Sequence, residues 1–496
     1  MSTRLYTAAQ LRELDRHAIE DLGIAGFDLM QRAAGAAWRV LCARWPRAQR
    51  LAVLCGGGNN GGDGYLLACQ ARAAGLPTIV LALAEPATTD ARRARDAWRD
   101  GGGETLAAEH GVPAADVYAD AIFGIGLARP VEGVAAQAIR HLHATGKPVL
   151  SLDVPSGIDA DTGAVFGVAV HADVTVSFIA RKRGLSTGAA LDHCGTLVLD
   201  RLGLPEQAFA DMPYDARLLD PRLLDPHRPA AWLPPRARDA HKGDFGHVLA
   251  IGGDAGMGGA IRLCAEAALR VGAGLVSAAT RPENITAINA ARPEVMVHGM
   301  ADAADLTPLL ARANVLALGP GLGRKSWGRT LWRAALDAHK PIVMDADALN
   351  LLAAESMALP PGSVITPHPG EASRLLGWNT ERIARDRFAA ARELAARFRC
   401  VAVLKGAGTL VAHENGDAAV CPWGNPGLAS GGMGDVLTGV IASLMAQGLN
   451  AWRAARFGVA LHAQAGDVAA RDGEAGTVAS DLFLHLRRLR NGISND

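Results

Sequence analysis

The chain has 496 residues, of which 49% are hydrophobic and 20% charged, and its 50 basic residues balance its 50 acidic ones. This length exceeds that of one hydrophobic core and predicts two domains, while the lack of net charge argues against nucleic-acid or membrane partners. No window reaches the roughly 18 apolar residues of a membrane span, and seven scattered cysteines predict no disulfide framework or zinc site, so we expect a cytoplasmic protein.

The first 217 residues predict an α/β domain. Residues 5–45 indicate two helices, and Thr7 is a suitable N-cap for the first. Short, nearly continuous apolar runs then alternate with helical segments, which is typical of an open, Rossmann-like, doubly wound αβα sandwich. The expected strands are 51–54, 78–83, 119–123, 148–152 and 174–179, and the expected helices are 65–74, 91–99 and 134–143.

A proline-rich stretch interrupts this pattern, and we interpret residues 218–240 as a linker. Residues 241–496 then predict a second β/α domain. Its expected strands are 248–251, 275–279, 315–318, 342–344, 364–366 and 402–404, and its longest expected helices are 260–271, 327–339 and 383–398.

A glycine-rich turn, Cys55-Gly-Gly-Gly-Asn-Asn-Gly-Gly-Asp-Gly64, follows the first strand of the first domain. Its glycines let backbone amides approach an anion. The turn formally matches a dinucleotide fingerprint and leaves a dehydrogenase open, although Glu85, the nearest acidic residue after the second strand, lies about 30 residues on. The oxygens of Asn59, Asn60 and Asp63 also suit a hard cation or a ribose.

Two carboxylates follow strands of this domain, namely Asp120 and Asp153. Carboxylates at buried strand ends require partners, and we choose Asp153 as the acid/base. Lys182 is a second candidate that we interpret as a surface lysine. The basic clusters at 181–183 and 487–490 are interpreted as solvated faces.

The glycine-rich turn, together with Asp153-Val-Pro-Ser-Gly-Ile-Asp159, resembles the YjeF N-terminal family, the epimerases of hydrated NADH and NADPH. The resemblance covers roughly residues 1–215. It implies that the hydrated dinucleotide is bound by Asp153, by Asn59, Asn60, Gly61, Gly62 and Asp63, and by Gly124, Ile125, Gly126, Leu127, Ala128, Arg129 and Pro130. It also implies a potassium ion held by Asn60, Asp120 and Ser156.

A second glycine-rich turn, Gly431-Gly-Met-Gly434, precedes a helix that we expect to start at Asp435. Amides at a helix N-terminus can stabilise a developing phosphoryl charge. The helix dipole is expected to depress the pKa of Asp435. Phosphoryl transfer requires little of a base beyond orienting the hydroxyl, so Asp435 is the candidate catalytic residue.

The turns of the second domain, in this order, resemble the YjeF C-terminal family, the nucleotide-dependent dehydratases of the same hydrates, which have a ribokinase-like αβα fold. The resemblance implies that Ala260, Gly321, His368 and Asp435 contact the hydrated dinucleotide. It further implies that Lys405, Gly406, Ala407, Gly408, Thr409 and Gly434 bind ADP or ATP. Mg²⁺ is expected with the nucleotide, and Asp345, Asp347 and Glu371 are its candidate ligands.

The two resemblances together imply a bifunctional repair enzyme. The first domain would epimerise the R and S hydrates, and the second would dehydrate the S form with ADP, giving AMP and phosphate. The alternative is a ribokinase-like small-molecule kinase fused to a non-catalytic Rossmann-like interaction module. We also expect a homo-oligomer.

Overall fold

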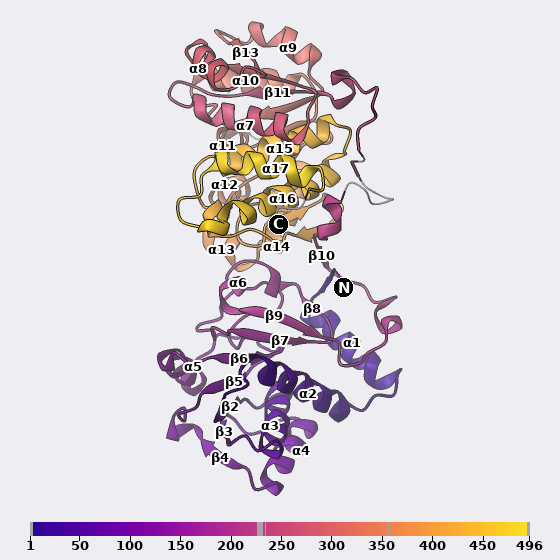
Figure 1. Ribbon diagram of the computed structural model, residues 1–496, viewed down its shortest axis with the longest axis vertical. Coiled ribbons are helices and arrows are strands. Elements are labelled where there is room, and N and C mark those ends of the chain that lie inside the picture. Colours follow the sequence, from indigo (N-terminus) through magenta and orange to yellow (C-terminus); the bar gives the residue numbers. More distant parts are fainter. Residues whose placement is uncertain (1–2, 226–231, 234, 356, 494–496) are drawn as a thin grey trace. The chain divides into compact units, whose positions relative to one another are not determined.

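The computed structural model describes residues 3–225, 232–233, 235–355 and 357–493 (Figure 1). The chain divides into two compact units, Met1–Arg217 and Leu218–Asp496. Part of the expected linker, residues 226–231 and 234, lies outside the described residues. None of the helices described is both long and apolar enough to cross a membrane.

A parallel sheet forms the centre of the first unit, with the strand order β4-β3-β2-β5-β6-β7-β9. The chain moves outward from β2 to β4 and then in the opposite direction from β5 to β9. This reversal confirms the doubly wound prediction and places a crevice where β2 and β5 end. The strands are β2 (Leu51–Cys55), β3 (Thr78–Ala82), β4 (Glu104–Ala107), β5 (Val117–Ala121), β6 (Val149–Leu152), β7 (Val174–Phe178) and β9 (Thr196–Asp200).

Helices cover both faces of this sheet. Along β2, Val53 contributes to the apolar cluster that includes α1 to α4, while Leu54 points to the cluster that includes α5. The predicted cap is confirmed, because the Thr7 hydroxyl accepts from the Gln10 amide. The helices are α1 (Ala8–Glu20), α2 (Gly26–Arg44), α3 (Asn59–Ala73), α4 (Thr89–Asp100), α5 (Gly133–Thr145) and α6 (Ala190–His193).

Three short strands lie outside the main sheet of the first unit, and the last of them ends at Leu218, the first residue of the second unit. They are β1 (Arg4–Tyr6), β8 (Arg181–Lys182) and β10 (Ala216–Leu218). Strand β1 pairs in parallel with β8 and antiparallel with β10. This pairing makes residues 181–182 part of a strand, whereas the sequence predicted a solvated basic face.

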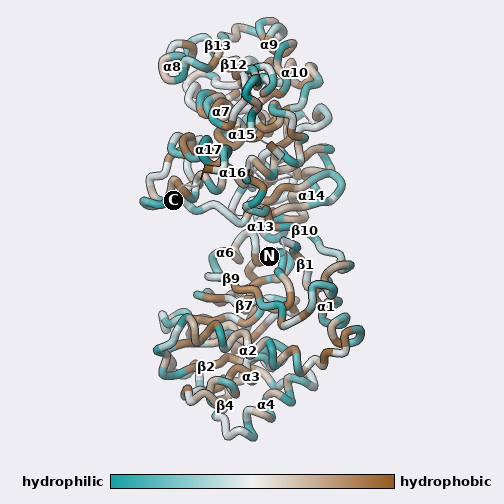
Figure 2. The backbone as a smooth tube through the Cα atoms, turned by 45° about the vertical axis from the view of Figure 1, so that its right-hand side comes forward, coloured by the Kyte–Doolittle hydropathy of each residue, from teal (hydrophilic) through white to brown (hydrophobic). Residues whose placement is uncertain are grey.

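The sheet of the second unit has the order β13-β12-β11-β14-β15-β16-β17-β18-β19. It is parallel up to β17 and antiparallel beyond it. The strands are β11 (His247–Ile251), β12 (Leu275–Thr280), β13 (Met296–Gly299), β14 (Val315–Leu318), β15 (Ile342–Met344), β16 (Val364–Ile365), β17 (Val401–Leu404), β18 (Leu410–Ala412) and β19 (Ala418–Val420). Figure 2 shows hydrophobic stretches running through the strands of each unit.

One face of this second sheet is covered by α7 (Gly258–Val271), α15 (Met433–Ala446), α16 (Ala451–Ala469) and α17 (Leu482–Arg490), as Figure 1 shows. The remaining helices are α8 (Ile285–Ala291), α9 (Thr307–Arg312), α10 (Ser326–Asp337), α11 (Ala346–Glu355), α12 (Pro369–Leu376), α13 (Thr380–Arg385) and α14 (Arg387–Phe398). The prediction of one helix over 383–398 is wrong. Asp386 separates α13 from α14 because its side chain caps α14 by accepting from the Ala389 amide at 2.9 Å.

Candidate active sites

A pocket of about 570 Å³ lies in the first unit at the carboxyl ends of the central strands. The structure brings many of the predicted site residues to its wall: Asn59, Asn60, Asp63, Gly124, Ile125, Gly126, Leu127 and Asp153. Other predicted residues do not line it: Gly61, Gly62, Asp120, Ala128, Arg129, Pro130 and Ser156. The pocket wall also includes Asp15, which sequence reasoning did not select, and Lys182, the second candidate that it interpreted as a surface lysine.

The glycine-rich stretch is the beginning of a helix and not a free loop. Helix α3 begins at Asn59, several residues before the predicted start at 65. A Cβ on Gly56 would lie 2.0 Å from the Ile122 carbonyl, and one on Gly61 would lie 1.9 Å from the Gly56 carbonyl. Backbone contact therefore requires both glycines, and it brings the N-terminal amides of α3 to the pocket, where they favour an anion.

Asp120 and Ser156 form a buried polar network directly behind this pocket wall. The Asp120 carboxylate accepts from the Ser151 hydroxyl and the Ser156 amide, each at 2.8 Å, and from the Ser156 hydroxyl at 2.5 Å. Burial raises the pKa of Asp120, although these hydrogen bonds oppose the rise. Among the described residues, Asn60 has no hydrogen-bond partner for either side-chain polar atom, and it is buried.

Lys182 is not the surface lysine that the sequence predicted. Its side chain is buried, forms an ion pair with Asp153, and donates to the Phe178 carbonyl at 2.7 Å. Asp153 in turn accepts from the Phe178 amide at 3.2 Å and has a φ of 67°, a left-handed conformation that is unusual for this residue type. The pairing of β8 with β1 holds Lys182 here and explains the wrong prediction.

Two further carboxylic acids face this ion pair. Burial raises the pKa of Asp63 well above its ordinary value, and the negative charges of Asp153 and Asp15 raise it further. Burial and Asp153 likewise raise the pKa of Asp15 to about 6. Asp15 follows Leu11 by four residues, so helical spacing already placed it beside the buried stripe of α1; this was the signal that could have identified it.

The candidate site of the second unit is a polar cluster at the strand ends. Asp345 follows β15, and its carboxylate accepts from the Lys405 ammonium at 2.7 Å and from the Thr438 hydroxyl at 3.1 Å. The same ammonium lies 4.0 Å from a carboxylate oxygen of Glu371. Burial lowers the pKa of Lys405, but Asp345 and Glu371 outweigh it and raise that pKa overall.

Asp435 lies in the first turn of α15, and its expected low pKa is wrong. Burial raises the pKa of Asp435 to about 7, with a further rise from Asp345 and an opposing effect from Lys405. Desolvation and a neighbouring carboxylate thus outweigh the helix N-terminus at this position. A carboxyl group that titrates near neutrality is a more effective proton acceptor than the sequence predicted.

Glycines bring the backbone close to this cluster. A Cβ on Gly434 would lie 3.0 Å from the Asp345 carboxylate and 3.1 Å from the Lys405 ammonium. A Cβ on Gly321, whose φ is 60°, would lie 3.2 Å from the Ala260 Cβ. The structure therefore places Ala260 beside Gly321, and Gly434 beside Lys405.

Residues 405–409 form the turn between β17 and β18, and sequence reasoning missed its main support, Arg387. This buried side chain donates to the carbonyl oxygens of Leu404 and Lys405 at 3.3 and 3.2 Å. Burial lowers the pKa of Arg387 to about 10. Within the turn, the Thr409 hydroxyl donates to the Gly406 carbonyl at 2.9 Å.

His368 caps α12. Its Nδ1 accepts from the Gly370 amide at 3.0 Å, while its own amide donates to Glu371 at 2.9 Å. Burial, followed by the positive charges of Lys405 and Arg374, lowers the pKa of His368. Burial also raises the pKa of Glu371 to about 7. His368 is therefore held in position, half-exposed, at the edge of the cluster.

Comparison with protein families gives a match for each unit. Residues 26–184 match the family described as YjeF-related protein N-terminus, and residues 248–488 match the family of NAD(P)H-hydrate dehydratase. A bifunctional NAD(P)H-hydrate repair enzyme from Coxiella burnetii is 48% identical over 99% of this chain and 100% of its own length. The enzyme of the same description from Escherichia coli is 43% identical over 98% and 94%.

Solved structures match the second unit. A hypothetical protein from Streptococcus mutans has a TM-score of 0.51 and 30% identity, covering 56% of this chain and 100% of its own. A ribokinase-like superfamily protein from Enterococcus faecalis has a TM-score of 0.50 and 30% identity, covering 53% and 92%. These likenesses confirm the ribokinase-like architecture expected for the second domain.

Proposed function

The chain belongs to the family of bifunctional NAD(P)H-hydrate repair enzymes, and we propose how its two sites divide the work. The N-terminal unit is the NAD(P)H-hydrate epimerase, and the C-terminal unit is the dehydratase. The observation that carries this assignment is the 48% identity to a bifunctional relative across 99% of this chain. A kinase fused to a non-catalytic module is not favoured.

In the epimerase, Asp153 is the proposed acid/base. Inversion at the hydrated carbon requires a proton to leave and return, and a positioned carboxylate within reach of the pocket can perform this transfer. The Lys182 ammonium and the Phe178 amide orient Asp153. Asp63, whose pKa is raised by burial and then by the charges of Asp153 and Asp15, is a second carboxylic acid in the same pocket.

We propose that Asn59 to Asp63 and Gly124 to Pro130 bind the dinucleotide, and that Asn60, Asp120 and Ser156 hold a potassium ion. The unpartnered, buried amide oxygen of Asn60 fits such an ion, because hard cations take carboxylate, amide and hydroxyl oxygens. When bound, potassium would supply positive charge beside the substrate phosphates. Asn60 and Asp63 are three residues apart at the start of α3, so helical spacing places both on the side of the helix that meets the pocket.

In the dehydratase, we propose that Asp435 accepts the proton of the substrate hydroxyl while that oxygen attacks the terminal phosphorus of ADP and AMP leaves. Loss of phosphate and of a ring proton then restores the nicotinamide. Lys405 to Thr409 and Gly434 bind the nucleotide, and Ala260, Gly321 and His368 contact the hydrate. Asp345, Asp347 and Glu371 suit Mg²⁺, which would neutralise phosphate charge when bound.

The test is recovery of reduced-nicotinamide absorbance from a mixture of R and S hydrates, with ADP, Mg²⁺ and K⁺. Wild type should convert the whole mixture, Asp435→Asn should convert none, and Asp153→Asn should stop near the S fraction once spontaneous epimerisation is subtracted. Replacing ADP by ATP decides the preferred nucleotide. Failure of wild type to recover any absorbance with either nucleotide would refute the proposal.

Further proposals concern the context of the enzyme. The seven cysteines are free, which supports a reducing compartment, the cytoplasm. Residues 218–240 are proposed as the linker between the domains 1–217 and 241–496. A homo-oligomer stays a prediction that sedimentation velocity can test.

A further inference from the structure

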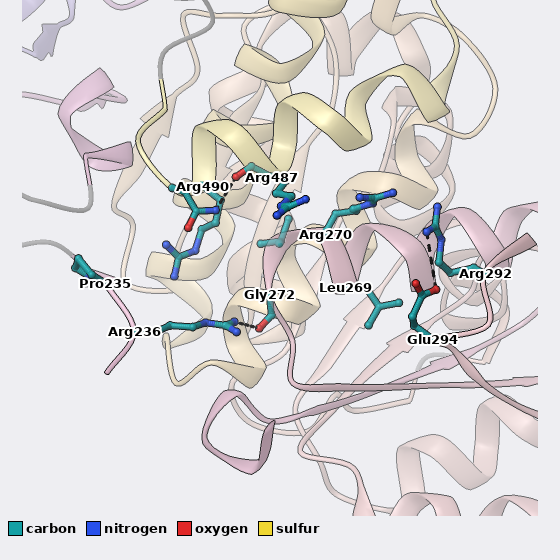
Figure 3. Close-up of a pocket in the computed structure, with 11 residues that line it drawn as sticks. Pro235, Arg236, Leu269, Arg270, Gly272, Arg292, Glu294, Arg487 and Arg490 are labelled. Atoms are coloured by element: carbon teal, nitrogen blue, oxygen red, sulfur yellow. Dashed lines mark hydrogen bonds and ion pairs between the residues drawn. The ribbon is translucent and has the colours of Figure 1, made fainter. Parts of the chain in front are cut away.

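An arginine-rich pocket of about 560 Å³ lies in the second unit, between the carboxyl ends of α7 and α17. Figure 3 shows Arg487 and Arg490 descending from α17 toward Arg270 and Gly272 of the facing segment. The residues that line the pocket are Pro235, Arg236, Leu269, Arg270, Val271, Gly272, Arg292, Glu294, Arg487, Arg490 and Asn491. Five arginines thus face one glutamate.

Three of these arginines are held in place by the protein. Arg270 and Arg292 pair with the buried carboxylate of Glu266, which also accepts from Arg262 at 3.3 Å. Arg236 donates to the Gly272 carbonyl and stacks 3.5 Å from the centre of the Phe245 ring. The cationic wall is therefore preorganised, and its positive charge exceeds what Glu266 and Glu294 can neutralise.

Arg490 is different, because it is buried and has no partner among the residues that the structure describes. Its exposed fraction is only 8%, yet in the described part of the chain no hydrogen-bond acceptor meets its Nε and no carboxylate pairs with it. Burial, together with the neighbouring charge of Arg236, lowers the pKa of Arg490 to about 10, so the guanidinium remains charged at neutral pH. The sequence prediction of a solvated face at 487–490 is wrong at this residue.

The position of these arginines at the end of α17 does not explain this burial. Basic residues favour helix carboxyl ends because they offset the dipole, but they do so at the surface, where water solvates them. A buried, unpaired charge is unfavourable unless a counter-charge joins it. An anion that enters the pocket would supply this missing partner.

We propose that this pocket binds a small anion with two or more phosphate groups, as a site separate from both active sites. Arginine forks bind phosphate oxygens in pairs, and several forks around one cavity suit several phosphates. Leu269 and Val271 provide an apolar wall for any organic part. Helix α7 has 14 residues and spans about 20 Å, so Ala260 of the dehydratase site lies near its other end.

The first experiment is calorimetric titration of the full chain with inorganic tripolyphosphate, which can also enter the dehydratase site. The pocket's contribution is therefore measured as the difference in tripolyphosphate binding between wild type and the variants. Arg490→Gln and Arg487→Gln should each weaken the pocket's share of binding by about tenfold or more, and Arg490→Lys should retain part of it. Arg385→Gln, on α13, removes the same charge elsewhere in the unit and should bind like wild type.

Folding of each variant is checked by thermal unfolding. If the Arg490 variant does not fold, Arg487→Gln still tests the proposal, because Arg487 is exposed and its replacement should not disturb the fold. Equal binding by wild type, Arg490→Gln and Arg487→Gln would overturn the proposal. So would a change in oligomeric state on Arg490→Gln with binding unchanged, because a second copy would then fill the pocket. ATP titrated in parallel identifies the source: the same loss for both ligands indicates phosphate recognition alone, and a larger loss for ATP indicates a nucleotide.

Discussion

Replacement of Asp435 by asparagine should stabilise the second unit, and by more at pH 8 than at pH 5. In the folded protein the pKa of this carboxyl is about 7, compared with 3.8 for an aspartate in the unfolded chain, because burial and the charge of Asp345 disfavour its ionised form. The folded state therefore retains the proton between pH 3.8 and about 7, whereas the unfolded state has lost it. The native carboxyl is tolerated at low pH and destabilises the fold as pH rises through its folded pKa.

The magnitude follows from linkage. At pH 5 the unfolded carboxyl is already ionised, whereas the folded carboxyl keeps its proton until the pH reaches about 7. These two pH units correspond to a loss of about 3 kcal/mol in the free energy of unfolding between pH 5 and 8. Asparagine has nearly the same shape and does not ionise, so it escapes this penalty. The difference in unfolding free energy between Asp435→Asn and wild type should grow by about 3 kcal/mol over this range, or roughly 5–10 °C in the midpoint of this unit.

The assay is urea unfolding, followed at pH 5, 6, 7 and 8 by the tryptophan fluorescence of the chain, without nucleotide. Asp417→Asn is the matched control, because it replaces an exposed carboxyl of the same unit. A stabilisation by Asp435→Asn that does not change with pH would refute the account of the pKa. Destabilisation at pH 8 would show that the ionised carboxylate supports the fold, contrary to the reasoning.

Three further predictions concern activity. Lys405→Met should move the acid limb of the dehydratase pH profile to higher pH, because Lys405 lowers the pKa of Asp435 and the proposed base must lose its proton to act. The pH dependence of kcat at saturating ADP measures this, and an acid limb that does not move would contradict the prediction. Lys182→Met should reduce epimerisation by about 100-fold or more while dehydration of pure S hydrate continues, as chiral chromatography of the hydrates can test; equal loss of both activities would point to misfolding. Asn60→Ala should lower the epimerase rate in KCl by about tenfold, to the rate that wild type has in choline chloride without potassium. If the rate of the variant still rises with potassium, Asn60 is not a ligand of the cation.

Much of the fold is predictable from the sequence because its central strands are buried on both faces and appear as continuous apolar runs. The edge strands are harder to predict: β4 and β9 are only partly buried, and their apolar runs are no longer than two and three residues. The glycine-rich stretches lie at both candidate sites, as the sequence predicted. Their conformation is less predictable, since Gly56, just before α3, lies against the carbonyl of Ile122 from a later part of the chain.

The site chemistry depends on partners that sequence order hides. Lys182 has the sequence context of a surface cluster, and only the pairing of β8 with β1 buries it beside Asp153. The pKa of Asp435 is set by burial and then by the charges of Asp345 and Lys405, which lie 90 and 30 residues earlier in the chain. The prediction of a low pKa considered only the helix N-terminus, which the local sequence shows, and not the charges that the fold brings near it.

The left-handed backbone at Asp153 has an evolutionary consequence. Asparagine and glycine are the residues that accept such a φ most readily, and one base change in an aspartate codon produces either of them. Asparagine also keeps an oxygen that can accept from the Phe178 amide and from Lys182. A lineage can therefore lose the proposed acid/base of this domain in a single step and retain the folded pocket, which would leave a binding protein in place of an enzyme.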